Sequence, residues 1–160
     1  MNKKIILTTI AIMTISFSSF CQKNYLKGYL IHLNGDTLNG FIDYRNWEKN
    51  PKQVYFKTAI DGQRILYTPI MIKGFSVSNE IYESAVVDIE ISDTRLGDLN
   101  YDRRLKLKVD TIFLQTLIRG TKSLYLNSDF GKELLYIKRD SMLELLLHKR
   151  FWIRMEVVEL

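Results

Sequence analysis

The sequence is poor in cysteine and in proline, with Cys21 as the single cysteine and Pro51 and Pro69 as the two prolines. Cys21 lies at the end of an N-terminal segment that resembles an export leader. A mature chain that begins after it contains no cysteine, which excludes a disulfide bond, a thiol nucleophile and a thiolate metal site. The stability of such a chain in an oxidising compartment must come from a packed core.

The N-terminal segment has the layout of a secretory signal peptide. Lys3 and Lys4 give it a positive start, and residues 5–17 are apolar or hydroxylated and carry no charge. The apolar run is shorter than the roughly 20 residues that a membrane-spanning helix needs. We therefore expect residues 1–21 to be a signal peptide and residues 22–160 to form a single β-rich domain.

The end of this leader allows two forms of processing. Lipidation of Cys21 would make the chain a lipoprotein, but such signals place a small residue just before the cysteine, where Phe20 stands here. Ordinary cleavage after Cys21 is therefore the preferred prediction. Either route exports the protein, so we expect it in the periplasm or associated with the outer membrane.

Strong charge of one sign is also absent. Without Lys3 and Lys4, the chain has 21 basic and 18 acidic residues, a formal net charge of +3. A mixed surface of this kind does not predict a nucleic-acid partner. No long hydrophobic run follows the leader, so we expect membrane association to be peripheral at most.

The sequence lacks the common catalytic and nucleotide-binding motifs. It contains neither Gly-x-x-x-x-Gly-Lys-Ser/Thr nor Gly-x-Gly-x-x-Gly to hold phosphate, and no Gly-x-Ser-x-Gly nucleophile turn. His32 and His148 are too few for a three-ligand metal site. Asp98 begins a calcium-loop pattern, but Arg103 and Val109 replace its sixth-position Gly and its twelfth-position Glu. We therefore predict no catalytic residue, cofactor, nucleotide or metal, and no enzymatic activity.

Strand-forming residues, by contrast, are abundant. Asn34-Gly35 between two apolar runs is a strong hairpin signal, because both residue types accept positive φ. Alternation and turn signals predict strands at Tyr25–Leu33, Thr37–Tyr44, Val54–Lys57, Arg64–Tyr67, Phe75–Val77, Ile81–Ile91, Lys122–Asn127 and Leu134–Lys138. Residues 110–118 fit a strand or a short helix equally well.

Helix signals are few. Thr68-Pro69 is typical of a helix start, and the leucine-rich run Met142–Leu147 is compatible with a helix. The predicted fold class is therefore mainly β, with antiparallel hairpins or a meander forming a twisted sheet, a sandwich or a partly open barrel. We expect eight to ten strands and one or two short helices.

One segment combines the residue types that dominate binding surfaces. Tyr44, Arg45, Asn46 and Trp47 offer large contact areas with polar groups. These four residues are the candidate partner or ligand contact. In the alternative that we favour, Trp47 plugs one end of the core, and Arg45 pairs with a neighbouring carboxylate such as Asp43.

Several strings in the chain resemble those of a family of secreted proteins from Bacteroidetes bacteria. The most specific is Gly28-Tyr29, Gly35-Asp36-Thr37, Gly40 to Trp47 and Lys49-Asn50-Pro51, and shorter matches are Tyr67-Thr68-Pro69, Gly74-Phe75, Ser84-Ala85-Val86, Phe113-Leu114-Gln115 and Ser123-Leu124-Tyr125. The resemblance covers residues 25–147. It implies an envelope protein whose domain, in longer relatives, precedes an outer-membrane β-barrel, and it implies no particular activity.

These inferences favour an exported, non-enzymatic module that binds or scaffolds another component of the cell envelope, with an envelope or outer-membrane protein as partner. Two alternatives stay open. One is a small ligand-binding protein or enzyme with a cleft near Arg45 and Trp47. The other is a β-structure subunit that is completed by strand addition.

Overall fold

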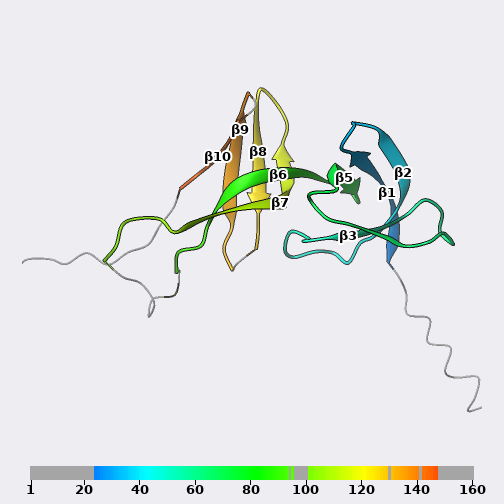
Figure 1. Ribbon diagram of the computed structural model, residues 1–160, viewed down its shortest axis with the longest axis horizontal. Helices are drawn as coiled ribbons and strands as arrows, with labels where there is room; N and C mark the ends of the chain where they lie inside the picture. The colour runs from blue at the N-terminus through cyan, green and yellow to red at the C-terminus, as the bar shows by residue number, and fades with distance from the viewer. Residues whose placement is uncertain (1–23, 94, 96–100, 130, 141, 148–160) are drawn as a thin grey trace, which may run out of the picture.

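The computed structural model describes residues 24–93, 95, 101–129, 131–140 and 142–147. These residues form one antiparallel sheet of ten strands in the order β10-β9-β8-β7-β6-β5-β1-β2-β3-β4 (Figure 1). The strands are β1 (Tyr25–His32), β2 (Thr37–Asp43), β3 (Val54–Lys57), β4 (Ile65–Tyr67), β5 (Ile72–Val77), β6 (Glu80–Glu90), β7 (Leu107–Ile118), β8 (Lys122–Asn127), β9 (Leu134–Arg139) and β10 (Met142–Leu145). The prediction of a mainly β fold is confirmed, and its shape is a strongly curled, partly open barrel.

The prediction of one or two short helices is wrong for the described residues, which contain none. At Thr68-Pro69 the chain makes a single turn, closed by a hydrogen bond from Met71 N to Thr68 O (3.0 Å), and β5 then begins at Ile72. The leucine-rich run forms β10 instead of a helix because β9 offers it an edge. Leu143 and Leu145 then alternate onto a core, and this packing outweighs the helix propensity of leucine.

The hairpin of β1 and β2 forms where the Asn-Gly signal predicts it, but with a different turn. His32 O accepts a hydrogen bond from Gly35 N (2.9 Å), and His32 N donates to Asp36 O (2.8 Å). Gly35 has a φ of +99°, whereas Asn34 does not have positive φ. This geometry is a type I turn followed by a glycine bulge, so Asn34 acts through its side chain, which accepts a hydrogen bond from Asp36 N (3.0 Å).

Gly28 and Gly40 lie directly opposite each other in this hairpin. A Cβ atom at Gly28 would collide with the carbonyl oxygen of Ser76, and one at Gly40 with the carbonyl oxygen of Lys57 and the ring of Phe56. The backbone of each glycine therefore lies close to a neighbouring strand. The missing side chains let the sheet coil tightly where β1 and β2 meet β3 and β5.

The sheet has two hydrophobic cores, and they lie on opposite faces. The first core is formed by Leu30, Ile42, Val54, Phe56, Ile72, Phe75, Val77, Tyr82 and Phe113. The second is formed by Val87, Ile89, Leu114, Tyr125, Leu134 and Tyr136. Side chains alternate along a strand, so Tyr82 on β6 faces the first core whereas Val87 and Ile89 face the second. The neighbours Phe113 and Leu114 divide in the same way on β7.

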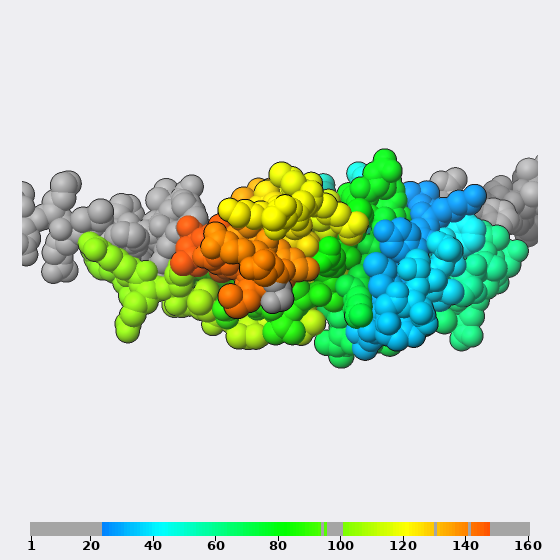
Figure 2. All heavy atoms as spheres, turned by 90° about the horizontal axis from the view of Figure 1, so that it is seen from above, coloured from blue at the N-terminus to red at the C-terminus, as the bar shows by residue number. Residues whose placement is uncertain are grey.

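The long ribbon of β6 and β7 therefore separates the cores. Its residues pair from Tyr82–Gln115 to Glu90–Leu107. The N-terminal strands curl around one face, and β8 to β10 curl around the other until β10 lies against β6. Figure 2 shows the two halves side by side along the long axis of the molecule.

Candidate functional site

The predicted contact segment belongs to a loop, residues 44–53, that crosses the first core. Trp47 packs its ring edge-to-face against Phe75 (5.9 Å between centroids) and Tyr82 (5.8 Å), and against Tyr44 at 5.0 Å. Trp47 and Tyr44 are both half-buried and contact the first core. The structure thus directs the two aromatic side chains of the candidate site mainly toward the interior.

Tyr44 also takes part in a small polar cluster. Its hydroxyl donates to Glu80 Oε1 (3.2 Å), and the hydroxyl of Tyr82 donates to Glu80 Oε2 (2.9 Å). Burial, together with the adjacent carboxylate, raises the pKa of both phenols. The two tyrosines are therefore hydrogen-bond donors to a carboxylate and not bases, and the bond from Tyr44 joins the loop to β6.

The other two residues of the candidate site face solvent. Arg45 Nη2 lies 3.1 Å from Asp43 Oδ2, with an Arg45 side chain that is 70% exposed and an Asp43 side chain that is 5% exposed. Asn46 is exposed and has a φ of +52°, a conformation that asparagine tolerates better than most residues. Arg45 and Asn46 are thus the part of the predicted contact that a partner can reach directly.

The sequence reasoning missed Asn50, the most completely hydrogen-bonded side chain of the loop. Asn50 Nδ2 donates to Phe113 O (2.9 Å) and to Leu126 O (2.8 Å). Asn50 Oδ1 accepts from Ser128 N (3.1 Å) and from Ser128 Oγ (3.0 Å). The amide therefore uses both donors and accepts twice, as much as its chemistry permits.

The position of Asn50 explains this role. β7 and β8 pair at Gln115 and Leu126, and in the same register Phe113 and Ser128 would be opposite each other two residues further along. The strands have separated there, and the amide of Asn50 replaces the missing ladder bonds. The motif Asn50-Pro51 thus joins the 44–53 loop to the junction between the two halves of the sheet.

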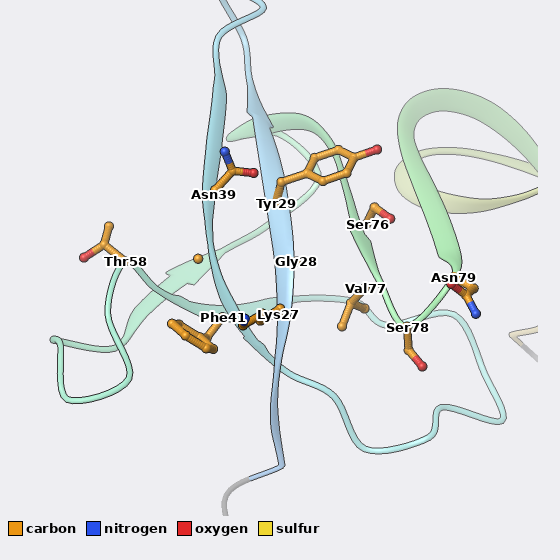
Figure 3. Close-up of a pocket in the computed structure, with 11 residues that line it drawn as sticks. Lys27, Gly28, Tyr29, Asn39, Phe41, Thr58, Ser76, Val77, Ser78 and Asn79 are labelled. Atoms are coloured by element: carbon orange, nitrogen blue, oxygen red, sulfur yellow. The ribbon is translucent and has the colours of Figure 1, made fainter.

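A groove lies on the face of β1, β2 and β5 that points away from the first core (Figure 3). Its volume is about 720 Å³ and it is open to solvent. Two aromatic side chains, Tyr29 and Phe41, and the backbone of Gly28 and Gly40 contribute to its lining. The polar side chains that line it are Lys27, Asn39, Thr58, Ser76, Ser78 and Asn79. No signal in the sequence marked this groove, because its residues come from four segments that are not consecutive.

The register of the strands sets the order of the groove residues. Tyr29 lies opposite Asn39 on one side and opposite Ser76 on the other, and Lys27 lies opposite Phe41. Directly paired residues point to the same face of a sheet. Tyr29 and Phe41 are therefore diagonal neighbours on one surface, with amide and hydroxyl groups beside them.

A second, smaller pocket of about 340 Å³ lies at one end of the second core. Glu83, which lines this pocket, accepts a hydrogen bond from the hydroxyl of Tyr125 (3.1 Å) and from Lys138 Nζ (3.4 Å), and lies 3.7 Å from Arg119 Nη2. Burial, and then the Glu83 carboxylate, raise the pKa of Tyr125. The two acidic and two basic side chains that line this pocket balance in formal charge.

A buried ion pair joins Glu90 and Lys132. Their side chains are 4% and 14% exposed, and Lys132 Nζ also donates to Ser92 O (3.1 Å). Ser92 N donates to Glu90 Oε1 (2.7 Å). Burial opposes the ionisation of Glu90, but the hydrogen bonds from Lys132 and Ser92 outweigh it and hold the pKa of Glu90 below its ordinary value.

The remaining sequence candidates are dispersed. His32 is half-buried, with its ring 6.2 Å from that of Tyr67. His148 and Asp98 lie outside the described residues. Within the described ranges, no three His, Cys, Asp or Glu side chains gather closely enough to hold a metal ion. In the same ranges, no helix has the length and apolar character to cross a bilayer.

Of the two pockets described above, the open groove over β1, β2 and β5 is the larger. It combines neutral hydrogen-bonding groups with two aromatic side chains and a single lysine. Such a lining suits binding more than acid–base or nucleophilic chemistry. Comparison of the chain with protein-family models, with curated proteins and with solved structures gives no match.

Proposed function

We propose that the protein is an exported, non-enzymatic binding module of the bacterial cell envelope, and that the groove over β1, β2 and β5 is its binding surface. The observation that carries this proposal is the lining of the groove, where Tyr29 and Phe41 stand beside neutral polar side chains. Ligand sites commonly join aromatic surface to a few polar groups that set orientation. Export is supported by the layout of residues 1–21.

The test combines fractionation with a variant that fills the groove. The full chain is expressed in a Gram-negative host, cells are fractionated, and the purified mature protein is incubated with washed envelopes. Ser76→Arg places a large side chain in the groove from a position that is half-exposed and outside both cores. We expect the parent protein to be exported and retained by envelopes, and the variant to be exported and folded but no longer retained.

Three results would refute the proposal. One is a precursor that stays in the cytoplasm. Another is equal retention of the parent protein and Ser76→Arg. The third is a soluble monomer that carries a tightly bound small molecule in a cleft near Trp47. The matched control is Lys73→Arg, which makes a conservative change at an exposed position of the same strand β5.

Completion by strand addition is the second candidate function. Strand β10 is at one end of the sheet order and, among the described strands, pairs only with β9, so one row of its backbone groups has no ladder partner there. The face of β10 that points away from the second core continues an apolar face of β8 and β9. On that face Leu126 pairs with Leu135, and Leu124 pairs with Ile137. Met142 on this strand is 76% exposed. An extended strand with alternating apolar residues is the partner that fits such an edge.

This alternative has its own test. A double variant, Met142→Lys with Leu146→Lys, places charges along the outer side of the edge and leaves the core residues of β10 unchanged. A complex or oligomer of the parent protein that dissociates in the double variant, as measured by analytical ultracentrifugation, supports strand addition. A monomeric parent protein with groove-dependent envelope retention refutes it.

A further inference from the structure

We infer that the groove over β1, β2 and β5 binds a neutral polysaccharide chain. This inference rests on the proposed function and adds the chemical class of the ligand. It is carried by three features of the groove: its aromatic pair, its neutral polar groups, and its place in the interior of the sheet.

The aromatic pair supplies the first argument. Tyr29 and Phe41 are diagonal neighbours across β1 and β2 and line the same groove. The faces of a sugar ring carry C–H groups that pack on an aromatic side chain, and a tyrosine adds a hydroxyl at the rim. Tyr29 points toward β5 and Phe41 points to the opposite side of the hairpin (Figure 3), so the two rings can contact separate sugar units along one chain.

The polar groups supply the second argument. Asn39 and Asn79 carry amides, and Thr58, Ser76 and Ser78 carry hydroxyls. Amides and hydroxyls both donate and accept hydrogen bonds, which matches the hydroxyl groups of a sugar. Lys27 is the one charged side chain in the described lining. A phosphate-rich polymer is bound by several cations together, so the groove fits an uncharged chain better than a nucleic acid.

The position in the sheet supplies the third argument and separates a saccharide from a peptide. The floor of the groove is formed by β1, which pairs with β2 on one side and with β5 on the other. The backbone groups of this floor are thus used within the sheet. An extended peptide gains most of its affinity by adding a strand to a free edge, and β1 has no free edge. A saccharide needs side-chain contacts only.

The shape of the groove agrees with a polymer. The groove is open, and the hairpin turn of Ser78 and Asn79 lies at one end of it (Figure 3). Both turn residues have positive φ, of 52° and 69°, as a two-residue turn between β5 and β6 requires. This turn holds the Asn79 amide at the rim. A chain can therefore enter and leave the groove, whereas a single small molecule would have few contacts.

The experiment uses the mature protein and defined polysaccharides. Affinity gel electrophoresis is run with dextran, laminarin, mannan and xylan as neutral probes and with alginate as an acidic comparison. The variants are Tyr29→Ala, Tyr29→Phe and Ser76→Arg. Tyr29 lies outside both cores, and thermal unfolding of each variant verifies that the fold is retained.

We expect at least one neutral polysaccharide to retard the parent protein. Tyr29→Ala should weaken this binding about tenfold, since an aromatic hot spot is lost, and Ser76→Arg should abolish it. Tyr29→Phe keeps the ring and should change affinity by less than about threefold. A hydrogen-bonding role of the tyrosine alone would instead make the two Tyr29 variants equally weak.

Three outcomes overturn the inference. The first is no retardation by any neutral polysaccharide. The second is retardation that is unchanged in Tyr29→Ala and Ser76→Arg. The third is binding to alginate alone, lost in high salt, which would show attraction by charge. If envelope retention depends on the groove but one of these results is obtained, the saccharide inference fails and the proposed function stands. If retention does not depend on the groove, the proposed function fails.

Discussion

The side chain of Asn50 should contribute more to stability than any other residue of the 44–53 loop outside the aromatic cluster. Its amide donates to Phe113 O and Leu126 O and accepts from Ser128 N. Asn50→Ala leaves these groups without their partner. An unpaired buried polar group costs about 1–3 kcal/mol. Only the bond to Phe113 O is fully buried, and water can replace part of the others, so we expect a loss of about 2–4 kcal/mol in total.

Asn50→Asp provides a sharper test because it keeps the acceptor and removes both donors. At neutral pH the introduced carboxylate faces two carbonyl oxygens, which raises its pKa in the folded state above the unfolded value. The variant is therefore least stable at neutral pH. It regains stability as the pH falls through the raised folded pKa, because the protonated acid can donate one hydrogen bond.

The assay for both variants is urea unfolding followed by circular dichroism between pH 4 and pH 8. Gln53→Glu is the matched control, because it makes the same amide-to-carboxylate change at an exposed position of the loop. We expect this control to change the free energy of unfolding by less than about 0.5 kcal/mol. A comparably small effect of Asn50→Ala, or a loss in Asn50→Asp that does not vary with pH, would show that the amide does not join the two halves of the sheet.

Two other perturbations act on the backbone and on the buried charges. Gly40→Ala forces a Cβ into the carbonyl of Lys57 and should lower the free energy of unfolding by about 1–3 kcal/mol. Gly120→Ala is the control, because its Cβ meets only ordinary contacts. Equal melting temperatures of the two variants in thermal unfolding would contradict the close approach. Lys132→Ala leaves Glu90 buried without its cation and should cost about 3–5 kcal/mol in urea unfolding. Because the folded pKa of Glu90 is lowered, the parent protein should lose this contribution as the pH falls through that pKa. If the free energy of unfolding of the variant falls with acid pH as steeply as that of the parent, this role of the ion pair is refuted.

The parts of the fold that the sequence predicts well are those with local signals. Val54–Lys57 and Lys122–Asn127 are strands with the predicted bounds, since short apolar alternation ends at clear turn residues. The hairpin around Gly35 is also a local feature, because the turn needs one residue with positive φ. For residues 110–118 the sequence allowed either a strand or a helix, and the segment forms a strand because β7 pairs with β6.

The parts that the sequence does not predict depend on distant contacts. The amide of Asn50 has its partners 63 to 78 positions away, so no local pattern indicates its role. The groove depends on the pairing of β1 with β5, which sets Tyr29 beside Ser76. The strand β10 exists because β9 has a free edge, a fact of topology that outweighs the helix propensity of Met142–Leu147.

The two-sided ribbon of β6 and β7 has a consequence for the accuracy of folding. In a sheet with a single core, a slip of one residue moves apolar side chains into water. Here a slip along β6 would withdraw Tyr82 from one core and, at the same time, Val87 and Ile89 from the other. The same slip along β7 would exchange Phe113 and Leu114 between the cores. Both cores therefore favour the same register of β6 and β7, and a misaligned ribbon loses the packing energy of both.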